Sequence, residues 1–159
     1  MEPLYSLEEL ANRVAINDLY ARYVHAVDAA DMNTLDQQVF LPETTFDWTD
    51  VGYIKYDWIT AKSDGLMSGE MFQFVFHLCG NIRIDFNEDQ TKAYVKSKTI
   101  HPTGTKDKEG NAKLFQVQGT YTDVLIRTNE GWRITERVWK GAWIAGGLTY
   151  VESMAAMLE

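Results

Sequence analysis

Apolar side chains recur at helical spacing near the start of the chain. Ser6 is placed to cap a helix and Glu9 to reach back to it, which is the capping-box pattern of a helix N-terminus. A repeat of about 100° per residue predicts one helix from there to about Ala29. Its apolar stripe comprises Ile16, Leu19, Tyr20, Tyr23, Val24 and Val27, and its polar side carries Asp18, Arg22 and His25.

Two shorter helices and one strand are expected before the middle of the chain. Residues 32–40 have helical character, and Pro42 is expected to end that helix. Residues 44–48 are typical of a short strand. A third helix is predicted over residues 57–67, where glycines near the end leave its last turn open.

From residue 72 onward the alternation of apolar and polar side chains has the period of two that is typical of strands. One strand is predicted over 72–86, with His77, Cys79 and Arg83 on one face. The other face comprises Phe72, Phe74, Phe76, Leu78, Ile82, Ile84 and Phe86. A second strand is predicted over 92–101, and its odd-numbered face consists of Ala93, Val95, Ser97, Thr99 and His101.

The last third of the chain predicts long hairpins. A polar loop at 102–112 precedes strands at 114–127 and 132–144, and a short helix is expected at 150–158. Helices followed by antiparallel hairpins indicate one α+β domain over residues 1–159, with helices packed on one face of a curved sheet. The second face of that sheet is also apolar, so a partner subunit is its simplest cover.

Composition narrows the function classes. The chain has 159 residues with a formal net charge of -8, which argues against nucleic-acid or anionic-membrane partners. A single cysteine, Cys79, excludes an internal disulfide and CxxC motifs. No basic leader or long apolar span is present, so we expect a cytoplasmic protein. Aromatic residues make up 13% of the chain, which favours an aromatic-lined cavity or a buried subunit interface.

The usual nucleophile, phosphate-binding and metalloprotease motifs are absent from the sequence. What remains is His77 and His101 on predicted strands, and Asp28 at the edge of the helix stripe that contains Tyr23. A carboxylate bonded to one ring nitrogen of a histidine fixes its tautomer and leaves the other nitrogen as a base. Such a pair suffices for eliminations and isomerisations without a metal or cofactor.

Each of these residues could instead have a purely structural role. Asp28 could cap or solvate a helix end, Tyr23 could be a core residue, and His77 a satisfied structural histidine. We expect His25 to be a surface residue and Cys79 a small buried hydrophobe. A metal site formed by His77, His101 and Asp28 is a weaker alternative.

Three segments carry a family resemblance. Residues 15–20 with Tyr23 and Asp28, residues 77–84, and residues 131–139 resemble the SnoaL-like branch of the nuclear-transport-factor-2-like (NTF2-like) superfamily. The resemblance spans about residues 7–145. It implies a cone: a strongly curved mixed sheet wrapped around N-terminal helices, with a pocket at the open end. Several relatives of this kind are trimers through the sheet, so the resemblance implies a homotrimer, with a dimer as the alternative.

The resemblance also implies roles for individual residues. In lyases such as scytalone dehydratase, an Asp and a His at the positions matching Asp28 and His77 form the catalytic dyad. A Tyr matching Tyr23 and a second His matching His101 recur in individual relatives. If His77, Arg83 and His101 face into the cone, the aromatic face of the strand at 72–86 is left for a neighbouring subunit.

The function expected from these residues is cofactor-independent elimination on a hydrophobic, ring-bearing or aromatic small molecule. His77 would be the base, Asp28 would orient it, and Tyr23 or His101 would assist the leaving group. Arg137 would bind a substrate oxygen or carboxylate. The expected walls are Tyr20, Trp48, Tyr53, Trp139 and Trp143.

The reaction itself stays open at this point. Water elimination is the first choice, while loss of halide, loss of formaldehyde and double-bond migration could use the same base. The alternatives are a non-catalytic ligand carrier, a structural subunit like the β subunit of ring-hydroxylating dioxygenases, and a polyketide cyclase.

Overall fold

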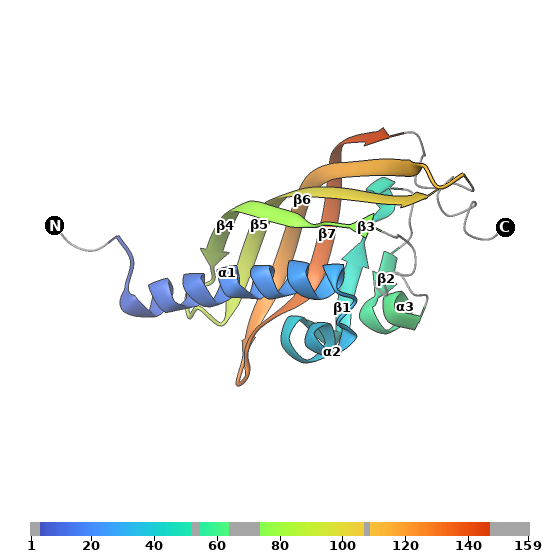
Figure 1. Cartoon of the computed structure of the whole chain (residues 1–159). Helices are drawn as coiled ribbons and strands as arrows, with labels where there is room; N and C mark the ends of the chain where they lie inside the picture. The colour runs from blue at the N-terminus through green and yellow to red at the C-terminus, as the bar shows by residue number, and fades with distance from the viewer. Residues whose placement is uncertain (1–3, 52–54, 64–73, 107–108, 147–159) are drawn as a thin grey trace.

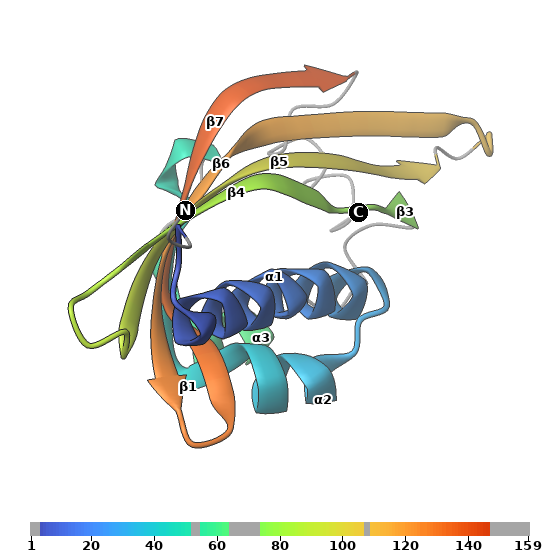
Figure 2. The ribbon, with the colours of Figure 1, turned by 90° about the vertical axis from the view of Figure 1, so that its left-hand side faces the viewer.

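The computed structural model describes residues 4–51, 55–63, 74–106 and 109–146. A long helix lies in the hollow of a strongly curved sheet, and the shorter helices sit beside its C-terminal half (Figures 1 and 2). The helices are α1 (Leu7–Asp28), α2 (Met32–Thr34) and α3 (Trp58–Ser63). The strands are β1 (Phe40–Asp47), β2 (Lys55–Asp57), β3 (Phe74–Val75), β4 (Leu78–Phe86), β5 (Lys92–Lys106), β6 (Ala112–Thr128) and β7 (Gly131–Gly146).

The sheet is mixed. Its strand order is β2-β1-β7-β6-β5-β3, and β4 pairs with β5 beside β3. The pairing of β1 with β7 is parallel, whereas the other pairings are antiparallel. The expected α+β cone is therefore confirmed, and its core lies between α1 and the concave face of the sheet.

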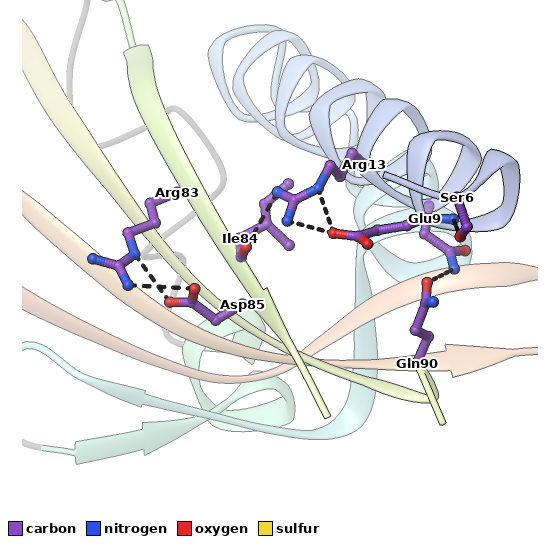
Figure 3. A network of polar contacts seen from close by, with 8 residues as sticks. Ser6, Glu9, Arg13, Arg83, Ile84, Asp85 and Gln90 are labelled. Carbon is purple, nitrogen blue, oxygen red and sulfur yellow. Dashed lines mark hydrogen bonds and ion pairs between the residues drawn. The ribbon is translucent and has the colours of Figure 1, made fainter. Parts of the chain in front are cut away.

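Helix α1 begins where the sequence predicts. Ser6 Oγ accepts a hydrogen bond from the Glu9 backbone N–H at 3.1 Å. The other half of the predicted capping box is wrong, because the Glu9 carboxylate pairs with Arg13 at 2.7 Å. Arg13 also donates to the Ile84 carbonyl at 3.2 Å, which ties the N-terminal half of α1 to β4 (Figure 3).

The segment after α1 departs from its predicted form. Helix α2 is a single turn that continues as a π-helical turn over Leu35–Val39. Pro42 does not end a helix, since it lies inside β1 where the register with β7 shifts between Phe40 and Thr45. An irregularity of this kind accommodates a residue that cannot donate to the ladder. The predicted third helix is present as α3, and its expected last residues, 64–67, lie outside the described residues.

The strand predicted over 72–86 is divided into β3 and β4. Within β4, the side chains before and after Asn81 alternate in opposite phase. Asn81 has a φ of 49°, and the pairs Gly80↔Lys98 and Arg83↔Lys96 enclose one extra residue on β4. Because side chains alternate along a strand, one inserted residue inverts the faces. Leu78 is therefore 52% exposed, whereas Ile84 is buried. The expectation that Arg83 shares the inward face of His77 is wrong.

The outward position of Arg83 is visible in its contacts. Its guanidinium pairs with Asp85 at 3.0 Å on the same exposed side of β4, away from Arg13 and Ile84 (Figure 3). The two predicted strands flanking the 102–112 loop are longer than expected. They pair from Lys92↔Ile126 to Lys106↔Ala112, so most of that loop is strand.

The remaining expectations concern the ends of the chain and membranes. The predicted helix at 150–158 lies outside the described residues. In the part of the chain that the structure describes, no helix combines the length and the apolar character needed to cross a bilayer.

Candidate active site

Asp28 and His77 form a hydrogen-bonded pair. Asp28 is the last residue of α1, and His77 lies in the two-residue link between β3 and β4. His77 Nδ1 lies 2.6 Å from Asp28 Oδ1, and the His77 backbone N–H donates to Oδ2 at 3.0 Å. A carboxylate only accepts, so Nδ1 carries the proton and Nε2 is the basic nitrogen. The His77 and Asp28 side chains are 12% and 23% exposed, so the pair is partly shielded from solvent.

His101 stacks against His77. Their ring centroids are 4.3 Å apart at an interplanar angle of 49°. Burial, then the neighbouring His77 and Arg137, lower the pKa of His101 to about 2. His101 is therefore neutral at physiological pH, and it can offer a neutral N–H but no imidazolium proton. Its Nε2 is buried and has no hydrogen-bond partner among the described residues.

Tyr23 lies next to His77 and Tyr121. Its ring meets that of His77 edge-on with centroids 6.3 Å apart, and its hydroxyl lies 3.2 Å from the hydroxyl of Tyr121. Burial raises the pKa of Tyr23, and the Arg137 cation offsets part of that rise. The phenol is thus protonated at neutral pH and can donate a hydrogen bond.

Arg137 is bound within the protein. Its guanidinium makes two hydrogen bonds to Asp123, from Nε at 2.9 Å and from Nη2 at 2.8 Å, and neither side chain is exposed. Burial alone would lower the pKa of Arg137, but the Asp123 carboxylate holds it above its usual value. The charge that the sequence analysis assigns to substrate binding is therefore paired with Asp123 inside the protein. Nη1 has no partner among the described residues.

Three of the predicted wall residues are buried or half-buried side chains of the core. Tyr20 is 1% exposed and donates a hydrogen bond to Asp123. Trp139 is 3% exposed, and its indole N–H donates to Thr99 at 3.4 Å. The half-buried Trp48 stacks on Phe46 with ring centroids 4.8 Å apart. The hydroxyl of Tyr20 is therefore bound to Asp123.

Trp143 is not brought to the site. The pairs Gln118↔Trp143 and Gly119↔Gly141 show that β7 carries one more residue than β6 at this point. The bulge places Trp143 opposite Gln118 on the convex face, where it is 51% exposed. The prediction that it lines the interior is wrong. The last predicted wall residue, Tyr53, lies outside the described residues.

The structure adds residues that the sequence analysis did not single out. Tyr121 and Asp123 face the concave side of β6 and contact Tyr23 and Arg137, respectively. Ser97 is 1% exposed on the inner face of β5, and its hydroxyl has no partner among the described residues. The alternation along β6 was a signal for Tyr121 and Asp123, since both follow the odd-numbered phase of that strand.

The other expectations concern metal binding and isolated residues. Within residues 4–51, 55–63, 74–106 and 109–146, no group of three or more His, Cys, Asp or Glu side chains is arranged to hold a metal ion. The alternative metal site at His77, His101 and Asp28 therefore lacks the required geometry. His25 is exposed as expected. Cys79 is partly buried against the core, and burial raises its pKa to about 11.

The curved mixed sheet wrapped around a helix is the NTF2-like fold, and the acid–histidine pair joins the end of that helix to the sheet. The family model described as the SnoaL-like domain matches residues 8–138, and the chain belongs to that family. An uncharacterized protein of Mycobacterium tuberculosis is 26% identical over 139 residues, which cover 85% of this chain and 88% of that protein.

Two solved structures are similar to this fold. A candidate scytalone dehydratase from Novosphingobium aromaticivorans has a TM-score of 0.72 at 19% identity, covering 88% of this chain and 90% of that one. A type 2 hexachlorocyclohexane dehydrochlorinase has a TM-score of 0.72 at 21% identity, covering 89% and 93%. At these identities the likeness establishes the fold alone.

Proposed function

We propose that this protein is a cofactor-independent lyase that eliminates water from a hydrophobic, ring-bearing small molecule. The observation that carries the proposal is the double hydrogen bond from His77 to the Asp28 carboxylate. It fixes the ring, its tautomer and the backbone beside it at once. A carboxylate partly withdrawn from water costs desolvation free energy, and functional sites are where such groups are retained.

The proposed reaction uses His77 Nε2 as the general base. It takes a proton from the carbon next to the one that bears the leaving hydroxyl, and the C–H electrons form the new double bond. The C–O bond breaks, and the departing oxygen receives a proton from Tyr23, so that water leaves. Asp28 stabilises the imidazolium that forms. A positioned base of this kind contributes about 10²–10⁴-fold to the rate.

Tyr23 is the proposed donor because His101 holds no extra proton. The pKa of His101 is depressed to about 2, so its part is limited to a hydrogen bond from or to the neutral ring. The leaving group is set by the substrate. Halide, which needs no proton, could depart after the same deprotonation. Loss of formaldehyde would instead require His77 Nε2 to take the proton of a hydroxymethyl O–H, whose electrons form the C=O bond while the C–C bond breaks and its electrons pass to the rest of the substrate. The named dehydratase and dehydrochlorinase neighbours are consistent with loss of water or of halide.

The experiment is a turnover screen of aromatic and alicyclic alcohols, chlorinated cyclohexanes and lignin-type diaryl compounds, read by mass spectrometry. The proposal predicts loss of one water from at least one alcohol, abolished in Asp28→Asn and His77→Gln and retained in Asp18→Asn. Asp18 is a matched control, because it lies on α1 but pairs with Arg22 on the exposed side. Binding without conversion, unaffected by either dyad variant, would instead establish a ligand-binding module.

We also propose that the convex face of the sheet forms a homotrimer contact. Leu78, Ile100 and Trp143 lie in one row across β4, β5 and β7, each about half exposed in the single chain. Phe74 and Leu114 flank Gly104 two rows further on. Several exposed large apolar side chains on one face of a sheet are typical of a subunit contact rather than of a solvated face.

A further inference from the structure

Tyr121 contacts the proposed proton donor and two groups close to it, His101 and Arg137. Its hydroxyl lies 3.2 Å from that of Tyr23, and its ring centroid lies 5.5 Å from that of His101. The guanidinium carbon of Arg137 sits 3.9 Å from the centre of the same ring. Tyr121 is 4% exposed, so these contacts are made away from bulk solvent.

The direction of the Tyr121–Tyr23 hydrogen bond follows from what Tyr23 must do. A phenol has one hydrogen, and if Tyr23 spent it on Tyr121 it could not donate to a leaving group. With Tyr121 as the donor, Tyr23 accepts on its oxygen and keeps its own hydrogen. Burial raises the pKa of both phenols, so each keeps its hydrogen at neutral pH and Tyr121 has one to donate.

The Arg137 cation lies against both phenol rings. Arg137 lies 4.1 Å from the centre of the Tyr23 ring as well as 3.9 Å from that of Tyr121. Its two bonds to Asp123 fix the guanidinium, and Tyr20 donates to the same carboxylate. A fixed positive charge beside a phenol favours negative charge on its oxygen, and it does so more strongly in a dry interior.

From this geometry we infer that Tyr121 is a positioning residue: it holds the Tyr23 hydroxyl and donates to its oxygen while that oxygen gives up its proton. The inference rests on the proposed elimination, in which Tyr23 is the donor. A hydrogen bond to a charged oxygen contributes more than one to a neutral oxygen. Removing it is therefore expected to lower kcat about 10- to 100-fold.

The test compares Tyr121→Phe with Tyr94→Phe. The first variant keeps the ring over Arg137 and removes only the hydroxyl. Tyr94 is the matched control, because it is 49% exposed and lies on the opposite face of β5 from His101. Carbon-13 NMR of protein with tyrosine labelled at the phenolic carbon gives one resonance for each tyrosine, and the Tyr23→Phe variant identifies that of Tyr23. This resonance should shift in Tyr121→Phe and stay in place in Tyr94→Phe.

The second part of the test is steady-state kinetics with a compound that the wild-type protein converts in the turnover screen. Tyr121→Phe should lower kcat with little change in KM and shift the alkaline limb of the kcat profile to higher pH, while Tyr94→Phe should match the wild type. An unmoved Tyr23 resonance, or a moved resonance with unchanged kcat, overturns the inference. If the wild type converts nothing, the proposed function fails and the catalytic part of Tyr121 fails with it, while the resonance still reports whether the hydrogen bond exists.

Discussion

The Asp28 carboxylate binds His77 twice, once through ring Nδ1 at 2.6 Å and once through the backbone N–H at 3.0 Å. The carboxylate lies at the very end of α1, so the helix terminus, the link between β3 and β4, and the imidazole are held by one side chain. This relationship separates the chemical role of Asp28 from its structural role. An amide in its place could still accept from the backbone N–H.

Asp28→Asn should therefore change the ring tautomer more than the fold. The amide nitrogen would face Nδ1 as a donor, which favours the proton on Nε2 and removes the base. We expect turnover to fall about 10²–10⁴-fold with little change in the melting temperature. Nitrogen-15 NMR of His77 should show the Nδ1–H tautomer in the wild type and the Nε2–H tautomer in the variant. An unchanged tautomer would contradict this assignment.

His101 gives a prediction about pH. Its pKa is about 2 in the folded protein and about 6.5 when unfolded, so below pH 6.5 the unfolded chain binds one proton more. Stability should consequently fall with decreasing pH from that point, with a contribution of about 1.4 kcal/mol per pH unit. Urea unfolding at several pH values between 7 and 5 gives the free energy of unfolding at each pH. That free energy should change less with pH in His101→Gln than in the wild type. An equal change in the two proteins would refute the prediction.

Removing one partner of the buried Arg137–Asp123 pair should be strongly destabilising. Asp123→Asn leaves a buried guanidinium without its counter-charge, so we expect a loss of about 3–5 kcal/mol in the free energy of unfolding. The double variant Arg137→Met, Asp123→Leu should regain most of it, because no charge then remains buried. Denaturant titration measures both changes.

The exposed pair Arg83–Asp85 provides the comparison. Its side chains are 76% and 59% exposed, so solvent screens the attraction. Asp85→Asn should change the free energy of unfolding by less than about 1 kcal/mol. If Asp85→Asn lowered the free energy of unfolding as much as Asp123→Asn, burial would not be what makes the interior pair more sensitive to the loss of its carboxylate.

The sequence could predict which side chains face the core wherever a helical or strand period runs without interruption. The stripe of α1 placed Tyr23 inside, and unbroken alternation placed Ser97 and His101 on the buried face of β5. Both patterns hold because no residue is inserted. The Asp28–His77 contact needed the family resemblance as well, since spacing along the chain does not show which strand a helix end meets.

Two side chains were assigned to the wrong face of the sheet because of inserted residues. Extrapolating the alternation of 72–86 across Asn81 assigned Arg83 to the wrong face, and a similar insertion in β7 moved Trp143 outward. Neither bulge changes the local composition, so hydropathy alone cannot reveal it. Only the positive φ of Asn81 had a sequence signal, because asparagine tolerates that region better than most residues.

Asn81 itself can be tested. Its φ of 49° is costly for β-branched side chains. Asn81→Val should lower the free energy of unfolding by about 1–2 kcal/mol, whereas Asn81→Gly should leave it nearly unchanged. Thermal unfolding of both variants measures this difference. Equal effects would show that the left-handed conformation is not what the site requires.

The convex face predicts how the protein assembles. Ile100 is 42% exposed, and its neighbours across the sheet are Leu78 and Gln118, the latter paired with Trp143. A carboxylate introduced there would be buried without a partner in any contact through this face, at a cost of several kcal/mol. Light scattering should therefore give three times the 18.2 kDa chain for the wild type and a single chain for Ile100→Glu. Lys96→Glu is the control, because it lies on the same strand face with its side chain beyond the apolar row. A wild-type monomer, or a trimer that survives Ile100→Glu, would exclude this face as the contact.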